Sequence, residues 1–241
     1  MGIVVQKFGG SSVANTEKLK IVSNQIIDSV KNGNKVVVVV SAQGDTTDEL
    51  IKQELELSNN PNPREHDVLL SVGEQITIAK LSILLYEMGY KAKSYTGWQL
   101  PILTDSNFEN ANILNIDTTK IIEDLENGYI VIVAGFQGVN NFGEITTLGR
   151  GGSDTTAVAL SAYLKADNLT IFTDVDGVFE EDPRLNSNAK KIDEITYDKM
   201  LEMSNNGAKV LHNKCVEFAK KFKVLINVKS TFSKGSGTIV K

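Results

Sequence analysis

The stretch TTLGRGGSDTTA, residues 146–157, combines three glycines with Arg150 and Asp154 between a β-like segment and an apolar helical one. A guanidinium presents a planar pair of donors that suits a carboxylate, and glycine lets a ligand approach the backbone closely. Asp154 falls in the first turn of the next helix, where the helix dipole favours an anion. The pattern predicts an anionic substrate held beside a phosphate in transfer. A purely structural role for both side chains is the alternative.

A second glycine-bearing turn follows the first predicted strand, in VVQKFGGSSV. Lys7 ends this strand. Gly9, Gly10 and Ser11 come next, so the ammonium would lie over a cradle of backbone N–H groups that suits phosphate. The order of residues matches neither a Walker A loop nor a G-x-G-x-x-G fingerprint. A strand-to-helix turn with serine caps explains the same residues, and the pattern alone leaves both interpretations open.

Two further turns carry polar side chains beyond strand ends. In SAQGDTTDELI, Ser41 and Thr47 follow a run of valines, and this segment would either cap the next helix or bind a substrate carboxylate. In LTIFTDVDGVFEEDPRL, the Asp-Gly turn is typical of a β-hairpin, whereas the side chains clustered beyond the strand favour a nucleotide. Those side chains are Thr173, Asp174, Phe179, Asp182 and Arg184.

Composition narrows the classes of protein. The chain has 241 residues, 41% hydrophobic and 23% charged, as in a globular protein of one large α/β domain or two packed lobes. A net charge of −5 without a long basic run argues against a nucleic-acid partner. A single cysteine, Cys215, excludes an internal disulfide and fits a reducing, cytoplasmic setting. No apolar run is expected to reach the roughly 20 residues of a membrane span, and no signal peptide is expected.

Strand-like and helix-like segments alternate along the chain, which predicts an α/β fold. We expect an open, mostly parallel central sheet of about eight strands with helices on both faces, and a hairpin in GVNNFGEITT. Strands are expected at 3–8, 36–40, 91–95, 129–134, 144–147, 168–173, 224–228 and 237–240. Helices are expected at 15–31, 46–58, 64–88, 118–126, 153–165, 196–204 and 207–222.

Seven sequence blocks, in order, closely resemble the aspartokinases, which are members of the amino acid kinase family. They are VVQKFGGSS, SAQGDTTDEL, LLSVGEQ, AGFQGV, TTLGRGGSDTTAVAL, TDVDGVFEEDPR and NGAKVLH, and the resemblance covers residues 1 to about 230. It implies the amino acid kinase fold and ATP-dependent phosphorylation of the β-carboxylate of L-aspartate to 4-phospho-L-aspartate, the first step of lysine, threonine and methionine biosynthesis. A carboxylate nucleophile, with a pKa near about 4, needs no general base.

By matching motifs, the resemblance implies roles for individual residues. Lys7 would stabilise charge on the transferring phosphoryl group, and Asp154 would orient Lys7. Arg150 would hold the α-carboxylate of aspartate, and Glu74 would pair with its ammonium. Further substrate-side residues are Ser41, Thr47, Gly151, Gly152 and Ser153. The nucleotide-side residues are Lys7, Gly9, Gly10, Ser11, Thr173, Asp174, Phe179, Asp182, Arg184, Lys209 and Val210, with phenylalanine at 179 where the family commonly has tyrosine.

The resemblance also implies domains and partners. Residues 1–229 would form the catalytic domain, whose N-terminal part binds aspartate and whose part from about residue 168 binds nucleotide. Aspartokinases usually continue into paired ACT domains, so 230–241 would be a short tail leading toward domains that this chain lacks. Mg²⁺ would arrive with ATP, held mainly by phosphates and water, without a named protein ligand. The expected partners are L-aspartate and ATP, without a membrane, and a homo-oligomer is compatible with the sequence.

Two other functions compete with this one. The first is a kinase acting on another acid, such as glutamate or acetylglutamate; Glu74 favours a free ammonium over an acylated amine. The second is a non-catalytic module that keeps nucleotide as a ligand, against which the set of Lys7, Arg150 and Asp154 argues. The remaining reactive side chains are expected to be structural, His212 in packing or at a helix start and Cys215 in the core.

Overall fold

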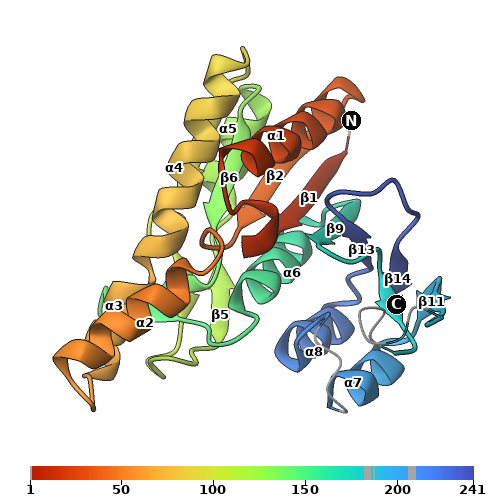
Figure 1. Ribbon diagram of the computed structural model, residues 1–241. Helices are drawn as coiled ribbons and strands as arrows, with labels where there is room; N and C mark the ends of the chain where they lie inside the picture. The colour runs from red at the N-terminus through yellow and green to blue at the C-terminus, as the bar shows by residue number, and fades with distance from the viewer. Residues whose placement is uncertain (1, 182–185, 187, 206–209) are drawn as a thin grey trace.

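The computed structural model describes residues 2–181, 186, 188–205 and 210–241 (Figure 1). Its centre is an eight-stranded sheet in the order β12-β14-β13-β9-β1-β2-β6-β3. Neighbouring strands in this sheet run parallel, except that β13 and β14 are antiparallel. Helices cover both faces, so the predicted α/β class is confirmed.

The middle of the sheet is made of β1 (Ile3–Phe8), β2 (Lys35–Val40), β6 (Ile130–Ala134) and β9 (Asn168–Thr173), with β3 (Ala92–Tyr95) at one edge. The five consecutive valines of β2 are all buried, because alternate side chains point to opposite faces. Val37 and Val39 belong to one core cluster, whereas Val36, Val38 and Val40 belong to the other. A strand covered on both faces needs such a continuous apolar run.

Different helices cover the two faces (Figure 1). On one face, α1 (Thr16–Lys31) and α4 (Val72–Glu87) pack on the sheet through side chains such as Ile26 and Leu81. On the other face lie α5 (Thr119–Glu126), α6 (Gly152–Leu164) and α8 (Asn213–Phe222), with α7 (Tyr197–Asn205) packed beside α8. Cys215 is fully buried there, as expected.

The carboxyl ends of the central strands meet at one edge of the sheet. Lys7 of β1 lies opposite Val39 of β2 and Ile171 of β9. The backbone continues this pairing into the turns, because the Gly9 N–H donates to the Phe172 carbonyl at 3.2 Å. Parallel strands therefore bring turns from distant parts of the chain together, as ligand sites in open α/β sheets require.

The helix expected over 64–88 is divided into α3 (Pro63–Leu70) and α4 by Ser71. The Ser71 carbonyl accepts a hydrogen bond from Gln137 Nε2 at 2.9 Å. Contrary to expectation, the joined segment 63–87 is long and apolar enough to cross a membrane, with a window of mean hydropathy 1.6 that is 44% buried. Core helices meet the same criterion, and the absence of a membrane partner stays a prediction.

A second sheet of four strands has the order β5-β4-β7-β8. Its strands are β4 (Ile102–Thr104), β5 (Ile113–Ile116), β7 (Gln137–Val139) and β8 (Ile145–Thr147), and β8 packs against α3, which is next to α2 (Thr46–Leu57). The hairpin expected in GVNNFGEITT is confirmed, with Val139 opposite Ile145. Sequence analysis did not predict β4 or β5, because strands of three or four residues carry little periodicity.

The C-terminal part differs from expectation in two places. β10 (Val178–Phe179) pairs with β11 (Lys191–Ile192), so the Asp-Gly turn does not fold back on its own strand. Helix α8 begins at Asn213 rather than near 207, and 206–209 lie outside the described residues. The strand expected at 237–240 is confirmed as β14 (Thr238–Val240), which pairs with β13 (Ile226–Ser230) and β12 (Glu194–Ile195), so the expected tail over 230–241 contains a strand of the central sheet.

Candidate active site

Lys7 and Asp154 form a buried ion pair where β1 ends. Lys7 Nζ lies 2.6 Å from Asp154 Oδ1, and each side chain is 10% exposed. Lys7 comes from the central strand and Asp154 from the first turn of α6. Each charge offsets part of the cost of burying the other, so the pair fixes an ammonium at the edge where the turns meet.

The turn after β1 is a short 3₁₀ helix that begins after Gly9 and includes Gly10 and the exposed Ser11. A Cβ on Gly10 would lie 2.8 Å from the carbonyl oxygen of Ala42, so glycine lets the turns after β1 and β2 touch. Helix α1 is capped by the Asn15 side chain. The interpretation of the serines as its caps is therefore wrong.

Ser41 directly follows β2 and Thr47 lies in the first turn of α2, and both are half-buried. Asp45 occupies the N-cap position of α2 without a side-chain capping bond, and Thr46 Oγ1 donates to the Gln43 carbonyl at 2.6 Å. The threonine cap expected for this helix is therefore not observed. Substrate binding by Ser41 and Thr47 stays a prediction.

Glu74 is buried in the first turn of α4, with 3% of its surface exposed. Its Oε1 accepts a hydrogen bond from the Ala42 N–H at 3.0 Å, whereas Oε2 has no partner among the described residues. Burial raises the pKa of Glu74 to about 8, against the opposing effects of the Ala42 bond and the Lys7 charge. Buried polar atoms nearly always have partners, so this oxygen is a candidate to accept a hydrogen bond from a ligand.

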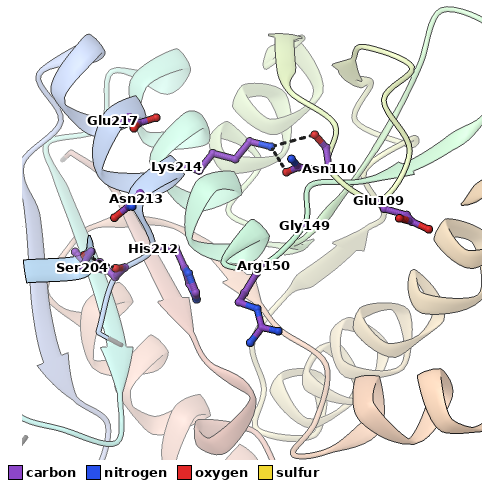
Figure 2. Close-up of a pocket in the computed structure, with 10 residues that line it drawn as sticks. Glu109, Asn110, Gly149, Arg150, Ser204, His212, Asn213, Lys214 and Glu217 are labelled. Carbon is purple, nitrogen blue, oxygen red and sulfur yellow. Dashed lines mark hydrogen bonds between the residues drawn. The ribbon is translucent and has the colours of Figure 1, made fainter. Parts of the chain in front are cut away.

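Arg150 lies between two glycines whose backbone angles other residues rarely adopt. Gly149 and Gly151, on either side, have φ of +75° and +73°. A Cβ on Gly149 would lie 2.8 Å from Asn110 Oδ1, and one on Gly151 would lie 2.5 Å from the His212 ring. The Arg150 side chain is exposed and extends into the same space as His212, where the structure has a cavity of about 670 Å³ (Figure 2).

Gly152 and Ser153 open α6, directly before Asp154. The Gly152 N–H donates to the Gly149 carbonyl at 2.9 Å. Ser153 is buried, and a Cβ on Gly135 would lie 2.7 Å from its Oγ. Gly135, in the AGFQGV block, therefore lets the chain after β6 pass close to the start of α6.

His212 connects the cavity with the ion pair. Burial lowers the pKa of His212; the Asp154 charge opposes this shift, and the Arg150 and Lys7 charges add to it. Because these three charges all reach one ring, they belong to a single site. His212 occupies the N-cap position of α8 without a side-chain capping bond. It also lines the cavity, a position that sequence analysis did not predict.

The structure describes some, but not all, of the residues predicted to bind the nucleotide. Thr173 ends β9, and its Oγ1 donates to Asp174 Oδ1 at 3.1 Å. Phe179 in β10 and Val210 before α8 are half-buried. Three predicted nucleotide-binding residues lie outside the described residues: Asp182, Arg184 and Lys209.

Two charged residues around the Arg150 turn escaped sequence analysis. Asp67 is fully buried, and its carboxylate accepts hydrogen bonds from the Glu109 N–H at 3.0 Å and the Thr147 N–H at 2.8 Å. Burial raises the pKa of Asp67, although these bonds oppose the shift. Lys214 lines the cavity and donates to Asn110 (Figure 2). No sequence pattern could reveal either residue, because their partners are far away along the chain.

Comparisons with known proteins agree with this arrangement. Residues 2–230 match the amino acid kinase family. The aspartokinase of Geobacillus stearothermophilus is 58% identical over 241 residues, all of this chain and 59% of the relative. The crystal structure of aspartate kinase from Synechocystis has a TM-score of 0.88 and 45% identity, over 99% of this chain and 39% of that one.

A second solved structure carries ligands in its description. E. coli aspartokinase III in complex with aspartate and ADP has a TM-score of 0.88 and 29% identity, over 99% of this chain and 64% of that one. The present chain spans less than two-thirds of the length of the curated aspartokinases it matches. The glycine-bearing turns meet in one site at the edge of the central sheet. Because the family match also extends over almost all of its residues, the chain belongs to the amino acid kinase family.

Proposed function

We propose that this chain carries the catalytic site of an aspartate kinase, which transfers the γ-phosphoryl group of ATP to the β-carboxylate of L-aspartate. The observation that carries the proposal is the buried Glu74 carboxylate, whose Oε2 has no partner among the described residues and lies within the field of Lys7. An α-ammonium supplies the missing donor. The similarity to aspartokinases over the whole chain supports the same substrate.

Arg150 supplies the complementary contact to the other end of the amino acid. Its exposed guanidinium binds the α-carboxylate as a planar pair of donors. Ser153 and the two glycines at the start of α6 place backbone and hydroxyl donors beside it, together with Ser41 after β2 and Thr47 in the first turn of α2. Held at both α-substituents, aspartate presents its β-carboxylate to the Lys7 ammonium.

The transfer needs no proton removal, because the β-carboxylate is ionised at neutral pH. One of its oxygens forms a bond to the γ-phosphorus while the bond from that phosphorus to the bridging oxygen breaks, and the electron pair leaves with ADP. Lys7 neutralises charge on the transferring group, and Asp154 holds Lys7 in place through their 2.6 Å contact. The protein therefore acts by positioning and electrostatics.

On the nucleotide side, the Gly10 and Ser11 N–H groups face the phosphates, and Gly9, whose own N–H bonds the Phe172 carbonyl, lets the phosphates approach the turn closely. Thr173, Asp174, Phe179 and Val210 surround the rest of the nucleotide, and the family positions Asp182, Arg184 and Lys209 complete the set. No group of three or more His, Cys, Asp or Glu side chains that could hold a metal ion occurs among the described residues. Mg²⁺ is proposed to bind through the ATP phosphates and water, where it would neutralise phosphate charge.

Hydroxylamine trapping of the acyl phosphate tests this function. The protein is incubated with ATP, Mg²⁺ and a panel of L-aspartate, L-glutamate and N-acetyl-L-glutamate. We expect product with aspartate and detectable but poor product with glutamate, because one methylene is worth only about 1–3 kcal/mol in a binding site. Product with another acid alone would establish a different amino acid kinase, and nucleotide binding without any product would establish a non-catalytic module. A Glu74→Gln variant serves as the control for the ammonium contact.

A further inference from the structure

Lys214, in the first turn of α8, ties that helix to two segments more than sixty residues away in the chain. Its Nζ donates to the Ala111 carbonyl at 2.6 Å, to Asn110 Oδ1 at 3.1 Å and to the Leu148 carbonyl at 3.1 Å, with a longer bond to the Asn110 carbonyl at 3.4 Å. An ammonium has three N–H donors, so these acceptors satisfy all of them. Figure 2 shows the side chain reaching from α8 toward Asn110.

The acceptors surround the base of the Arg150 turn. Leu148 is fully buried and directly precedes Gly149, the first residue of that turn. Asn110 is the residue against which Gly149 packs, since a Cβ on Gly149 would lie 2.8 Å from Asn110 Oδ1. Lys214 therefore holds both Leu148, which joins β8 to the turn, and the segment on which the turn rests.

The chemistry of these contacts favours positioning over simple charge pairing. Each acceptor is a neutral carbonyl or amide oxygen, so the bonds depend on geometry more than on charge. Burial lowers the pKa of Lys214, while the charge of Asp105 opposes this shift. These hydrogen bonds offset the cost of keeping this ammonium half-buried, which a lysine that serves only surface solubility would not need.

We propose that Lys214 is a positioning residue for the acceptor-substrate site. From helix α8, which lines the cavity, it fixes the backbone that leads into Arg150 and the segment on which the Arg150 turn rests. The proposal rests on the proposed function, because it takes Arg150 to bind the substrate carboxylate. Lys214 does not touch the reacting atoms; it acts through the Leu148 and Asn110 oxygens.

The test compares Lys214→Met with Lys220→Met, a change of the same chemistry on the same helix. Lys220 is 50% exposed and pairs with Asp198 on the surface, away from the cavity. We expect Lys214→Met to raise the KM for aspartate about tenfold or more, with the KM for ATP changed less than about twofold. Lys220→Met should leave both constants unchanged. A Lys214→Arg variant should recover most of the loss, because a guanidinium can donate to the same carbonyls.

A merely structural lysine gives a different result. In that case Lys214→Met lowers the melting temperature without separating the two KM values, or Lys214→Arg fails to recover the aspartate KM, and either result would overturn the proposal. Amide hydrogen exchange supplies a readout that needs no turnover. We expect faster exchange at Gly151 and Gly152 in Lys214→Met than in Lys220→Met, and equal rates would also overturn the proposal.

These measurements keep the two proposals apart. A wild-type protein that forms no aspartyl hydroxamate contradicts the proposed function, and the exchange rates then decide the role of Lys214 alone. A wild-type protein that phosphorylates aspartate, beside a Lys214→Met variant with unchanged aspartate KM and exchange, leaves the function standing and removes Lys214 from it.

Discussion

Binding of aspartate should be coupled to the ionisation of Glu74, and this coupling has a calculable size. With a pKa of about 8, the free site holds a protonated Glu74 in about nine-tenths of the molecules at pH 7. An ammonium requires the carboxylate form, so binding at pH 7 must first ionise Glu74 at a cost of about 1.4 kcal/mol, close to a factor of ten in affinity. The penalty grows as the pH falls and vanishes as it rises past 8.

Isothermal titration of aspartate in several buffers measures this coupling directly. Binding should release about 0.9 proton per aspartate at pH 7, about 0.5 at pH 8 and about 0.1 at pH 9, read from the dependence of the heat on buffer ionisation enthalpy. The Kd for aspartate should weaken about fifty-fold from pH 8 to pH 6, because the ionised fraction falls by that factor.

The Glu74→Gln variant is the control, because an amide of the same size cannot ionise. It should bind aspartate more weakly at pH 8 and show neither the proton release nor the pH dependence. A wild-type Kd that is constant between pH 6 and 8, with no buffer-dependent heat, would refute the assignment of the ammonium site to Glu74. Proton release that persists in Glu74→Gln would assign it to another group.

Four further outcomes follow from the same geometry. Lys7→Ala should lower kcat by about 10²–10³ with little change in the KM for ATP, and near wild-type turnover would exclude Lys7 from the transfer. Asp154→Asn should lower kcat less than Lys7→Ala does, since Asp154 acts through Lys7; an equal or larger loss in kinetic assays would contradict that order. Gly151→Ala should raise the aspartate KM and lower stability through its clash with a neighbouring ring, whereas Gly143→Ala, with the same sign of φ and open space around it, should cost only about 1 kcal/mol in denaturant melts. Without aspartate, the free energy of unfolding of wild type relative to Glu74→Gln should fall as the pH rises from 5 to 8. The reason is that the folded state keeps a proton on Glu74 that the unfolded chain has lost. Urea titrations in which this difference rises with pH would contradict a raised pKa for Glu74.

The sequence alone determined the central sheet and the turns that carry the site. Five successive valines indicated a strand buried on both faces, and β2 is such a strand. Lys7 followed by glycines, and Asp154 at the start of an apolar helix, indicated charged groups at strand and helix ends, where the structure joins them in one ion pair. These features are local: residue type and short-range periodicity fix them, so the neighbours along the chain are enough to predict them.

The tertiary structure decided what depends on distant partners. The strands β4 and β5 gain their stability from pairing within the second sheet rather than from their own three or four residues. No motif reveals the Glu74 oxygen that lacks a partner among the described residues, nor the acceptors of Lys214, because burial and hydrogen-bond satisfaction arise only when separate segments pack. The sequence thus determined which charged groups stand at the ends of elements, and the packing of those elements decided which of them are buried, which are paired, and which are left for a ligand.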